Sequence, residues 1–542
     1  MTEPVGGDNM SMKSGKRMVD QAWSWRAWLV CGFARCQHCP RPLWAMVFGY
    51  LILGAWCWIE WGASGWPIGS FWWDELALAG AAEAVRTGMV PTVDFWAPFI
   101  LPIYLKHWAV TWVGHGGAFV LENLIQGGVV LALFCWLSGR ARHHVWVYCA
   151  GALAVLGAVA PFNLGSVTEA ELGTVTFAGA YNRLGGALVA LVLLLPAVAP
   201  PDDVGRRVRW IGWLASLFFL AALLKITVLQ IAWAWVLVLQ LVQPGRGWGR
   251  LLVHASLWCL AALVVVAWVA GGASGYWSAL SGLSEVRWSV LEQEWRRYVG
   301  FLIFSQRVPL SLLLMAALLM ACSGWLCGRP WLRSVVVYLF GCAAVCAYTL
   351  TNFGDQGVMP AASALCVLLC VWGMGRELEP STGPRVRTER LLWLAGNGLF
   401  VALLLLHVAS LAYWTCVLHA ERDRRGLIKL PLSSRMLVDN YLIEPEAWAT
   451  RPDMVQADLP INLGNPGVYA SYLVGVDEAA TYLRSNMPDL SRSVYALDFP
   501  AYIFSVVGGY RIPENSYPWL HVGHEITLDK YPHPRDLLKD VD

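Results

Sequence analysis

Residues 208 to 243 read VRWIGWLASLFFLAALLKITVLQIAWAWVLVLQLVQ, an apolar stretch of 36 residues with Lys225 at its centre. A bilayer core of about 30 Å is crossed by about 20 apolar residues in helical form. Arginines flank the stretch at positions 206 to 209 and 246 to 250, and such residues are typical of cytoplasmic loops. Because two cytoplasmic ends require an even number of crossings, we predict two short helices that meet at Lys225, on the outer side of a membrane.

The rest of the chain shares this apolar character. Hydrophobic residues make up 57% of the 542 residues and charged residues 14%, and the mean hydropathy is +0.51, which excludes an ordinary water-soluble protein. A net charge of +2, without any basic block among aromatic residues, argues against nucleic acid as a partner. The apolar runs lack the period-two alternation of barrel strands, so the fold class that we predict is an all-α polytopic membrane protein.

Apolar runs of spanning length predict eleven transmembrane helices. They lie near residues 43 to 60, 117 to 137, 145 to 161, 184 to 199, 208 to 224, 227 to 243, 251 to 271, 308 to 327, 334 to 350, 358 to 374 and 391 to 416. Arginines gather before the first run and in every second loop after it, which places the N-terminus in the cytoplasm and the tail outside. These arginines are Arg26, Arg35, Arg41, Arg140, Arg142, Arg206, Arg207, Arg209, Arg246, Arg250, Arg329, Arg333, Arg376, Arg385, Arg387 and Arg390.

The predicted organisation has three parts. Residues 1–42 form a polar and basic cytoplasmic segment that is unlike a cleavable leader, so the first apolar run is expected to stay as a signal anchor. Residues 43–416 form the transmembrane domain. Residues 417–542 alternate polar and short apolar segments and predict a small, separate α/β domain outside the membrane, with a helix over 476–487 and a strand over 493–499.

The first outward loop, residues 61–116, is both aromatic and acidic. Its section from Asp74 to Thr87 has a helix-forming composition, and Gly88 is a stop signal. We predict an interfacial helix there that turns Leu76, Ala79 and Ala82 toward lipid or protein.

Carboxylates in this loop are candidates for catalysis. Asp74, Glu75 and Asp94 are the catalytic candidates, and Asp74 and Asp94 stand among phenylalanines and tryptophans. Apolar surroundings raise the pKa of a carboxyl toward the range of a useful general base. The alternative is that Asp74 only caps the helix while Glu75 and Glu83 are solvated, and for Glu83 solvation is our prediction.

Cations on the predicted outer side are candidates for binding a phosphate. They are Arg183 in AGAYNRLGG, Lys225, and Arg296 or Arg297 in EQEWRRYVG. Arginine holds phosphate bidentately, and lysine acts more as a point charge. The alternatives are that Arg183 is a snorkelling anchor and that Arg296 and Arg297 pair with nearby glutamates.

Three other polar motifs are candidate binding sites. Asn352, Asp355 and Gln356 in TNFGDQGVMP could bind sugar hydroxyls or form only a polar turn. The CxxC of residues 36–39 and the HVGH of residues 521–524 lack partners at zinc-site spacing. We therefore predict no metal site and no cofactor, although a divalent metal at the carboxylates is left open.

Asp74 and Glu75, followed by AxxAEAVRTGMVP, resemble the first outward loop of GT-C glycosyltransferases, particularly aminoarabinose transferases and protein O-mannosyltransferases. VDFWAPF, YNRLGG and the isolated Lys225 look like features of bacterial members of this superfamily. The resemblance implies that a carboxylate of the loop is the catalytic base and that a polyprenyl-phosphate-linked sugar is the donor. Aminoarabinose transferases usually show Lys and Pro soon after this motif, whereas APFILPIYLKHW offers Lys106 later, so the acceptor need not be lipid A or a protein.

We expect an inverting glycosyltransferase that works at the outer face of a bacterial cytoplasmic membrane on a glycan, lipid or protein acceptor. A transporter or flippase of a lipid-linked saccharide is the alternative. It should carry ionisable residues near the middle of the membrane, whereas the charges of this chain gather outside the apolar runs. An inactive scaffold in an envelope polysaccharide complex is a third candidate.

Overall fold

A computed structural model of the chain describes residues 49–56, 66–67, 72–138, 145–159, 180–195, 204–242, 247–269, 274–277, 281, 426–432, 441–450, 466–496, 501–518, 535 and 541, apart from a few single residues inside these ranges. This part of the chain is mostly helical and contains little strand. Three of its helices are long and apolar enough to cross a membrane, namely Ile100–Leu137, Arg207–Leu224 and Trp248–Trp268. The predicted spans from residue 308 to residue 416 lie outside the described residues.

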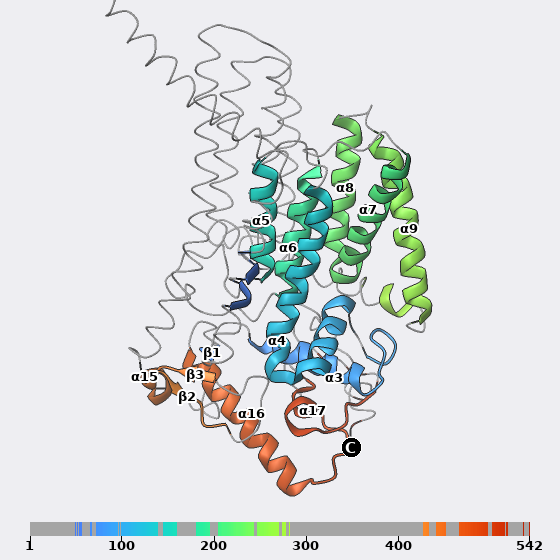
Figure 1. The fold of residues 1–542 in the computed structure, drawn as a ribbon. Coiled ribbons are helices and arrows are strands. Elements are labelled where there is room, and N and C mark those ends of the chain that lie inside the picture. The colour runs from blue at the N-terminus through green and yellow to red at the C-terminus, as the bar shows by residue number, and fades with distance from the viewer. Residues whose placement is uncertain are drawn as a thin grey trace, which may run out of the picture.

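Helix α4 (Ile100–Ser138) is the longest described element and runs from one end of the bundle to the other (Figure 1). Its 39 residues would reach about 58 Å as one straight helix, nearly twice the thickness of a bilayer core. The helix is broken at Gly114, whose φ of 73° and ψ of 174° are not helical. The sequence predicted a span from 117 only. The part of α4 after the break matches that span, whereas the part before the break, back to Ile100, was not predicted as a helix.

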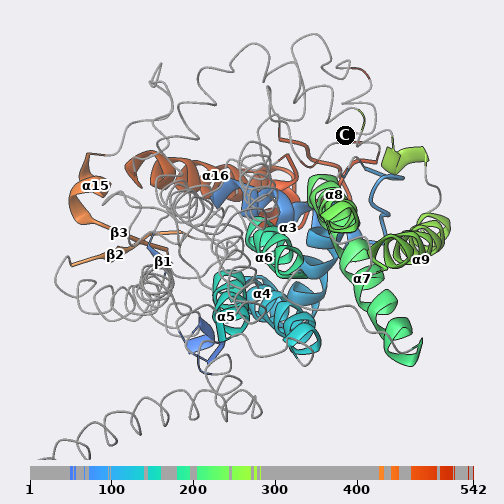
Figure 2. The same cartoon turned by 90° about the horizontal axis from the view of Figure 1, so that it is seen from above.

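Helices α5 to α9 follow α4 along the chain. Their bounds are α5 Val145–Val159, α6 Ala180–Leu193, α7 Val204–Leu224, α8 Ile226–Val242 and α9 Trp248–Val269. Lys225 is the single non-helical residue between α7 and α8, which pack against each other, so the chain turns back there (Figures 1 and 2). The predicted pair of short helices that meet at Lys225 is confirmed.

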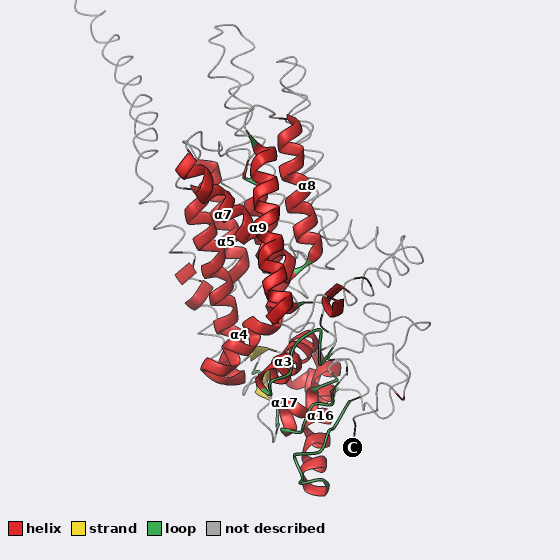
Figure 3. Cartoon of the chain, turned by 90° about the vertical axis from the view of Figure 1, so that its right-hand side faces the viewer, coloured by secondary structure: helices red, strands yellow, loops and turns green. Residues whose placement is uncertain are grey.

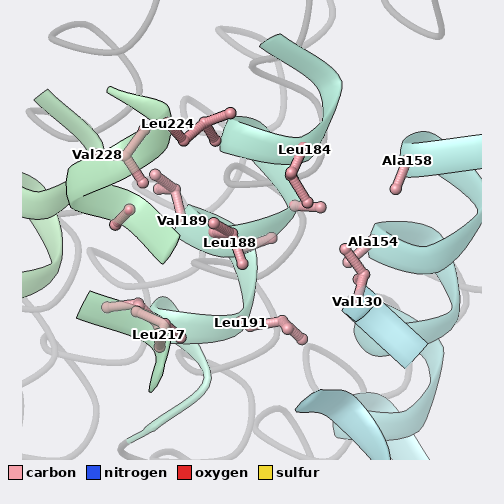
Figure 4. Close-up of a cluster of buried hydrophobic side chains, with 14 of the residues drawn as sticks. Val130, Ala154, Ala158, Leu184, Leu188, Val189, Leu191, Leu217, Leu224 and Val228 are labelled. Carbon is pink, nitrogen blue, oxygen red and sulfur yellow. The ribbon is translucent and has the colours of Figure 1, made fainter. Parts of the chain in front are cut away.

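Helix α6 lies at the centre of this group and contacts α4, α5, α7 and α8. Figure 4 shows aliphatic side chains of α6 meeting those of its neighbours. The labelled side chains are Val130 of α4, Ala154 and Ala158 of α5, Leu184, Leu188, Val189 and Leu191 of α6, Leu217 and Leu224 of α7, and Val228 of α8. Dispersion and close packing hold these helices together, because lipid tails are as apolar as leucine.

A second group of elements lies beyond one end of the bundle (Figure 3). It contains helix α3 of the first loop and the C-terminal helices α15, α16 and α17. Their bounds are α3 Trp72–Arg86, α15 Pro445–Ala449, α16 Pro466–Asn486 and α17 Ile503–Gly508. Helix α3 packs against both α4 and α17, so it lies between the bundle and the C-terminal segment.

A small sheet also joins the first loop to the C-terminal segment. Strand β3 (Tyr441–Ile443) pairs in parallel with β1 (Trp66–Pro67) and antiparallel with β2 (Ile428–Lys429). The central strand of this sheet therefore comes from the C-terminal segment, and one of its two partner strands comes from the first loop.

The predictions for the C-terminal segment had mixed outcomes. The helix predicted over 476–487 is present as the longer α16. The predicted strand over 493–499 is wrong in its described part, where Ser493 forms only an isolated bridge with Arg511. Ala496 donates its N–H to the carbonyl of Ala501 at 3.0 Å, so the chain turns there instead of extending along a partner strand.

Candidate functional site: a buried ionic cluster at the end of the bundle

Glu75 lies in the first turns of α3 and points into an ionic cluster. Its Oε1 contacts Nζ of Lys106, which lies in the part of α4 before Gly114. The same Nζ is 2.6 Å from Oε2 of Glu122, which lies in the part of α4 after Gly114. The exposed fractions of these side chains are 6%, 1% and 0%, respectively. The lysine and the two carboxylates therefore come from three different helical segments, and their burial keeps bulk water out of the site.

The helix that carries Glu75 is placed by its small apolar residues. Leu76 and Ala79 are fully buried and belong to the core formed with α4. Helix α3 ends at Arg86, followed by Gly88 with φ 96°, as the predicted stop signal requires. The prediction that Leu76, Ala79 and Ala82 face lipid or protein is confirmed, since all three are buried.

Burial strongly affects the charge of Glu75. Removal from water raises the pKa of its carboxyl to about 7; Lys106 and Arg183 act to lower this pKa, and Glu122 acts to raise it. Glu75 is therefore not solvated, contrary to the alternative raised from the sequence. A carboxyl with this pKa exchanges a proton near neutral pH.

Arg183 of α6 extends the cluster toward the centre of the bundle. Its side chain is fully buried, and its NH2 group donates to Oδ1 of Asn123 at 2.6 Å. Gln126, one turn further along α4, donates to Oε1 of Glu122 at 3.3 Å. Arg183 is thus not a snorkelling anchor. With both glutamates ionised, Glu75, Glu122, Lys106 and Arg183 form a buried set with balanced charge.

Lys225 lies at the corner between α7 and α8, also on the buried side. Its Nζ donates to Oδ1 of Asn182 at 2.8 Å. The ammonium lies 5.5 Å from the ring centre of Phe99 and 5.0 Å from that of Tyr181, and the two rings stack on each other. Rings in this position attract a cation through their negative faces. Asn182 is the neighbour of Arg183 in α6, so the two cations approach the same end of that helix.

Asp94 lies in a tight turn of the first loop. Its Oδ2 accepts the N–H of Val90 at 2.7 Å, and the side chain is half-buried. Thr92 adopts a positive φ of 72° in this turn, a conformation that costs energy for a β-branched residue. The bond from Val90 occupies one carboxylate oxygen and holds Asp94 in a fixed orientation.

The Asp94 turn is linked to the Lys225 corner by a short helical segment, residues 274–277. A Cβ on Gly275 would lie 2.2 Å from the carbonyl oxygen of Thr92, so the two backbones touch. The next residue, Tyr276, donates its hydroxyl to the carbonyl of Ala222 at 2.7 Å, one turn before Lys225. Candidates from the first loop and from the bundle therefore approach the same region.

Glu83 differs from its prediction. It is buried, and its carboxylate accepts a hydrogen bond from Nε of Arg86 at 2.8 Å, with His115 3.9 Å away. The sequence predicted a solvated side chain, and that prediction is wrong because α4 covers this face of α3. The guanidinium of Arg86 remains largely exposed.

The remaining candidate site residues have side chains outside the described part of the chain. Asp74 belongs to the first turn of α3, but its side chain is not described. Residues outside the described part of the chain are Arg296, Arg297, Asn352, Asp355, Gln356, His521, His524, Cys36 and Cys39. Among the described residues, no group of three or more histidines, cysteines or carboxylates is arranged to hold a metal ion.

Most partners in this cluster were not predicted from the sequence. Lys106 was noted only as a departure from the family pattern, and Glu122, Asn123 and Gln126 were hidden inside a predicted apolar span. A signal was present, since ionisable residues within a membrane helix are costly and usually functional. The expectation that charge gathers outside the apolar runs is wrong for α4, whose candidate span contains both Lys106 and Glu122.

No family model, curated protein or solved structure matches this chain. The arrangement itself offers three chemical resources at one end of the bundle. These are carboxylates that can accept a proton, buried cations that can hold an anion, and surrounding apolar helices that suit a lipid.

Proposed function

We propose that this protein is an inverting glycosyltransferase of GT-C architecture that uses a sugar carried on a polyprenyl phosphate. In this proposal the chain crosses a bacterial cytoplasmic membrane eleven times, with its N-terminus in the cytoplasm and residues 417–542 outside. The acceptor is a glycan, a lipid or a protein at the outer face. The observation that carries the proposal is the convergence of Glu75, Arg183 and Lys225 at the end of the bundle, beside the Asp94 turn.

The chemistry requires a base and a site for the leaving group. An acceptor hydroxyl attacks the anomeric carbon, and the bond from this carbon to the phosphate oxygen breaks. The electron pair of that bond leaves with the polyprenyl phosphate, and the hydroxyl proton passes to a carboxylate. We assign the base to Asp74 or Asp94, with Glu75 as the third candidate, and the leaving phosphate to Lys225 and Arg183.

Several features support this assignment. Lys225 lies between two apolar helices, where a lipid phosphate would bring its own apolar chain. The aromatic rings of Phe99 and Tyr181 keep its ammonium in a fixed position. Asp94 is half-buried and held by Val90, so it can reach solvent without losing its orientation. A donor that is already activated on a lipid needs no nucleotide site.

The test is transfer of sugar from a polyprenyl-phosphate donor by the purified full-length protein. Asp74→Asn should abolish transfer while the protein stays folded, and Asp94→Asn is measured beside it to identify the base. Lys225→Met should raise the KM for the donor, because a phosphate contact is lost. Asp489→Asn is the matched control, since Asp489 is exposed in a turn after α16 and should leave the rate unchanged. Full activity in both Asp74→Asn and Asp94→Asn would rule out the assigned bases.

A second candidate function is supported by α4. Its break at Gly114 and its buried Lys106 and Glu122 are features found in transporters, where broken helices and intramembrane charges line a path. The same preparation discriminates the two functions. In vesicles that contain the protein, donor lipid that crosses the membrane without being consumed would favour a transporter or flippase.

A further inference from the structure

We infer that Lys106 is a positioning residue, which holds the first turn of α3 and its carboxylates against the broken helix α4. The inference rests on the proposed function, since it names the residue that orients the site of the transfer reaction. In this inference Lys106 is neither the catalytic base nor a ligand of the phosphate. Lys106 acts through Glu75, the side chain that it contacts and orients.

Lys106, Glu75 and Glu122 form a three-way ionic contact, which we call the joint. The Nζ of Lys106 contacts Glu75 of α3 and lies 2.6 Å from Glu122 of α4. Lys106 and Glu122 lie on opposite sides of the break at Gly114. The ammonium also lies 5.4 Å from the ring centre of Phe119, which closes the site on one side. Any change in the bend of α4 would pull Lys106 from one of its two carboxylates.

Burial makes this joint rigid. An ion pair in water contributes little, because solvent replaces either partner. Here water is excluded, and loss of one partner would leave an uncompensated charge in the interior. Lys106 is thus held at both carboxylates at once. Glu75 immediately follows Asp74, so the joint also fixes the backbone of the turn that carries the candidate base.

Charge in the joint is balanced by named groups. Glu75 faces Lys106 from α3, Glu122 faces it from α4, and Arg183 of α6 acts on Glu75 from the other side. His115, beyond the break, is the other described titratable group that senses Lys106. Lys106→Met alone would leave two buried carboxylates with one fewer cation, and that variant could fail to fold. Lys106→Met with Glu122→Gln removes one charge of each sign and keeps the balance.

The experiment compares the wild type, this double variant and Lys429→Met, an exposed lysine on β2, in the transfer assay from pH 5 to 9. A melting temperature near that of the wild type shows that the double variant folds. We expect its kcat to fall about tenfold or more, since a small misplacement of a catalytic group has that effect. The KM for the donor should stay within about twofold. If Glu75 is the base, the acid limb of the pH profile should move to higher pH, because Lys106 lowers the pKa of Glu75 more than Glu122 raises it.

Three results would overturn the inference, and they differ in what they leave standing. A double variant with the kcat and pH profile of the wild type would show that Lys106 only balances charge, while the proposed function stands. A wild-type protein that transfers no sugar would remove the proposed function and this role together. A double variant that does not fold is replaced by Lys106→Met with Glu122→Leu, which keeps the charge balance and fills the space with an apolar side chain. Failure of both variants to fold would assign Lys106 to stability and overturn its role in positioning.

Discussion

The two faces of helix α3 are held in different ways. Toward α4 it presents Glu75 and Glu83 beside the apolar Leu76 and Ala79, and the contact of Glu75 with Lys106 is ionic and buried. Toward the C-terminal segment it presents Ala77, Ala81 and Gly80, and the contact with Tyr502 is apolar and close. The apolar face can tolerate small changes by shifting, whereas the ionic face cannot, because a buried charge that loses its partner has no substitute. The difference indicates that the face toward α4 fixes the position of α3, and that the face toward Tyr502 adds packing stability.

The largest effect should come from breaking the ionic face. Lys106→Met removes the cation that Glu75 and Glu122 share, and loss of one partner of a buried ion pair typically costs about 3–5 kcal/mol. We expect a lower melting temperature in detergent and a loss of monodisperse protein on size exclusion. Lys429→Met is the control for loss of an exposed lysine. Equal melting temperatures for the two variants would contradict the importance of the ionic face.

The next effect should come from crowding the apolar face. A Cβ on Gly80 would lie 2.7 Å from Cβ of Tyr502, so Gly80→Ala should destabilise the protein by about 1–3 kcal/mol. Gly475→Ala is the matched control, because Gly475 is an exposed glycine of α16 with nothing within 4 Å of the new Cβ. That variant should gain up to about 1 kcal/mol from helix propensity. A melting temperature of Gly80→Ala equal to or above that of the wild type would show that α3 and Tyr502 are not in close contact.

A smaller effect concerns pH. The pKa of Glu75 is raised to about 7 in the folded protein, above its ordinary value of 4.5, so the folded state binds more protons between these values. The stability that this group contributes is therefore present at low pH and is lost as pH rises toward and through 7.

Glu75→Gln should remove this part of the pH dependence, so its melting temperature should vary less than that of the wild type between pH 5 and pH 8. The effect amounts to a few kcal/mol at most, since each pKa unit corresponds to about 1.4 kcal/mol. Glu478→Gln on α16, where the side chain is exposed, should keep the slope of the wild type. An unchanged slope in Glu75→Gln would mean that another group titrates.

The smallest effect should come from the edge of the ionic face. The Glu83 carboxylate is buried, but its partner Arg86 is largely exposed, so solvent weakens their interaction. Arg86→Met should lower stability by at most about 1 kcal/mol, and 0.5 M salt should reduce the difference further. A loss as large as that of Lys106→Met would show that the two ends of this face are equally protected from water.

Parts of the fold followed from local patterns in the sequence. The helix of the first loop and its end near Gly88 were predicted from composition and a stop signal, and the structure confirms them. The break at Lys225 was predicted from the arginines on both sides, because two ends on the same side of a membrane require an even number of crossings between them. The part of α4 before the break at Gly114 was missed, since its polar and aromatic residues resemble a loop when their partners are unknown.

The site followed from the sequence only in part. Glu75, Asp94, Arg183 and Lys225 were singled out by type and position, but their partners were not. Glu122 and Lys106 are separated from Glu75 by 47 and 31 residues, respectively, and no local pattern relates residues at such distances. The sequence also did not decide whether Arg183 is a surface anchor or a buried residue; the structure shows that it is buried and donates to Asn123.

By itself the sequence determined the apolar character of the bundle, the helix of the first loop and the turn at Lys225. These depend on the number of apolar residues in a row and on charges near them, which are properties of short segments. Only the tertiary structure decided which charges meet. Whether a carboxylate is solvated or buried depends on the helix that covers it, and for Glu75 and Glu83 that helix is α4, which bends at Gly114 to bring Lys106 and Glu122 to one point.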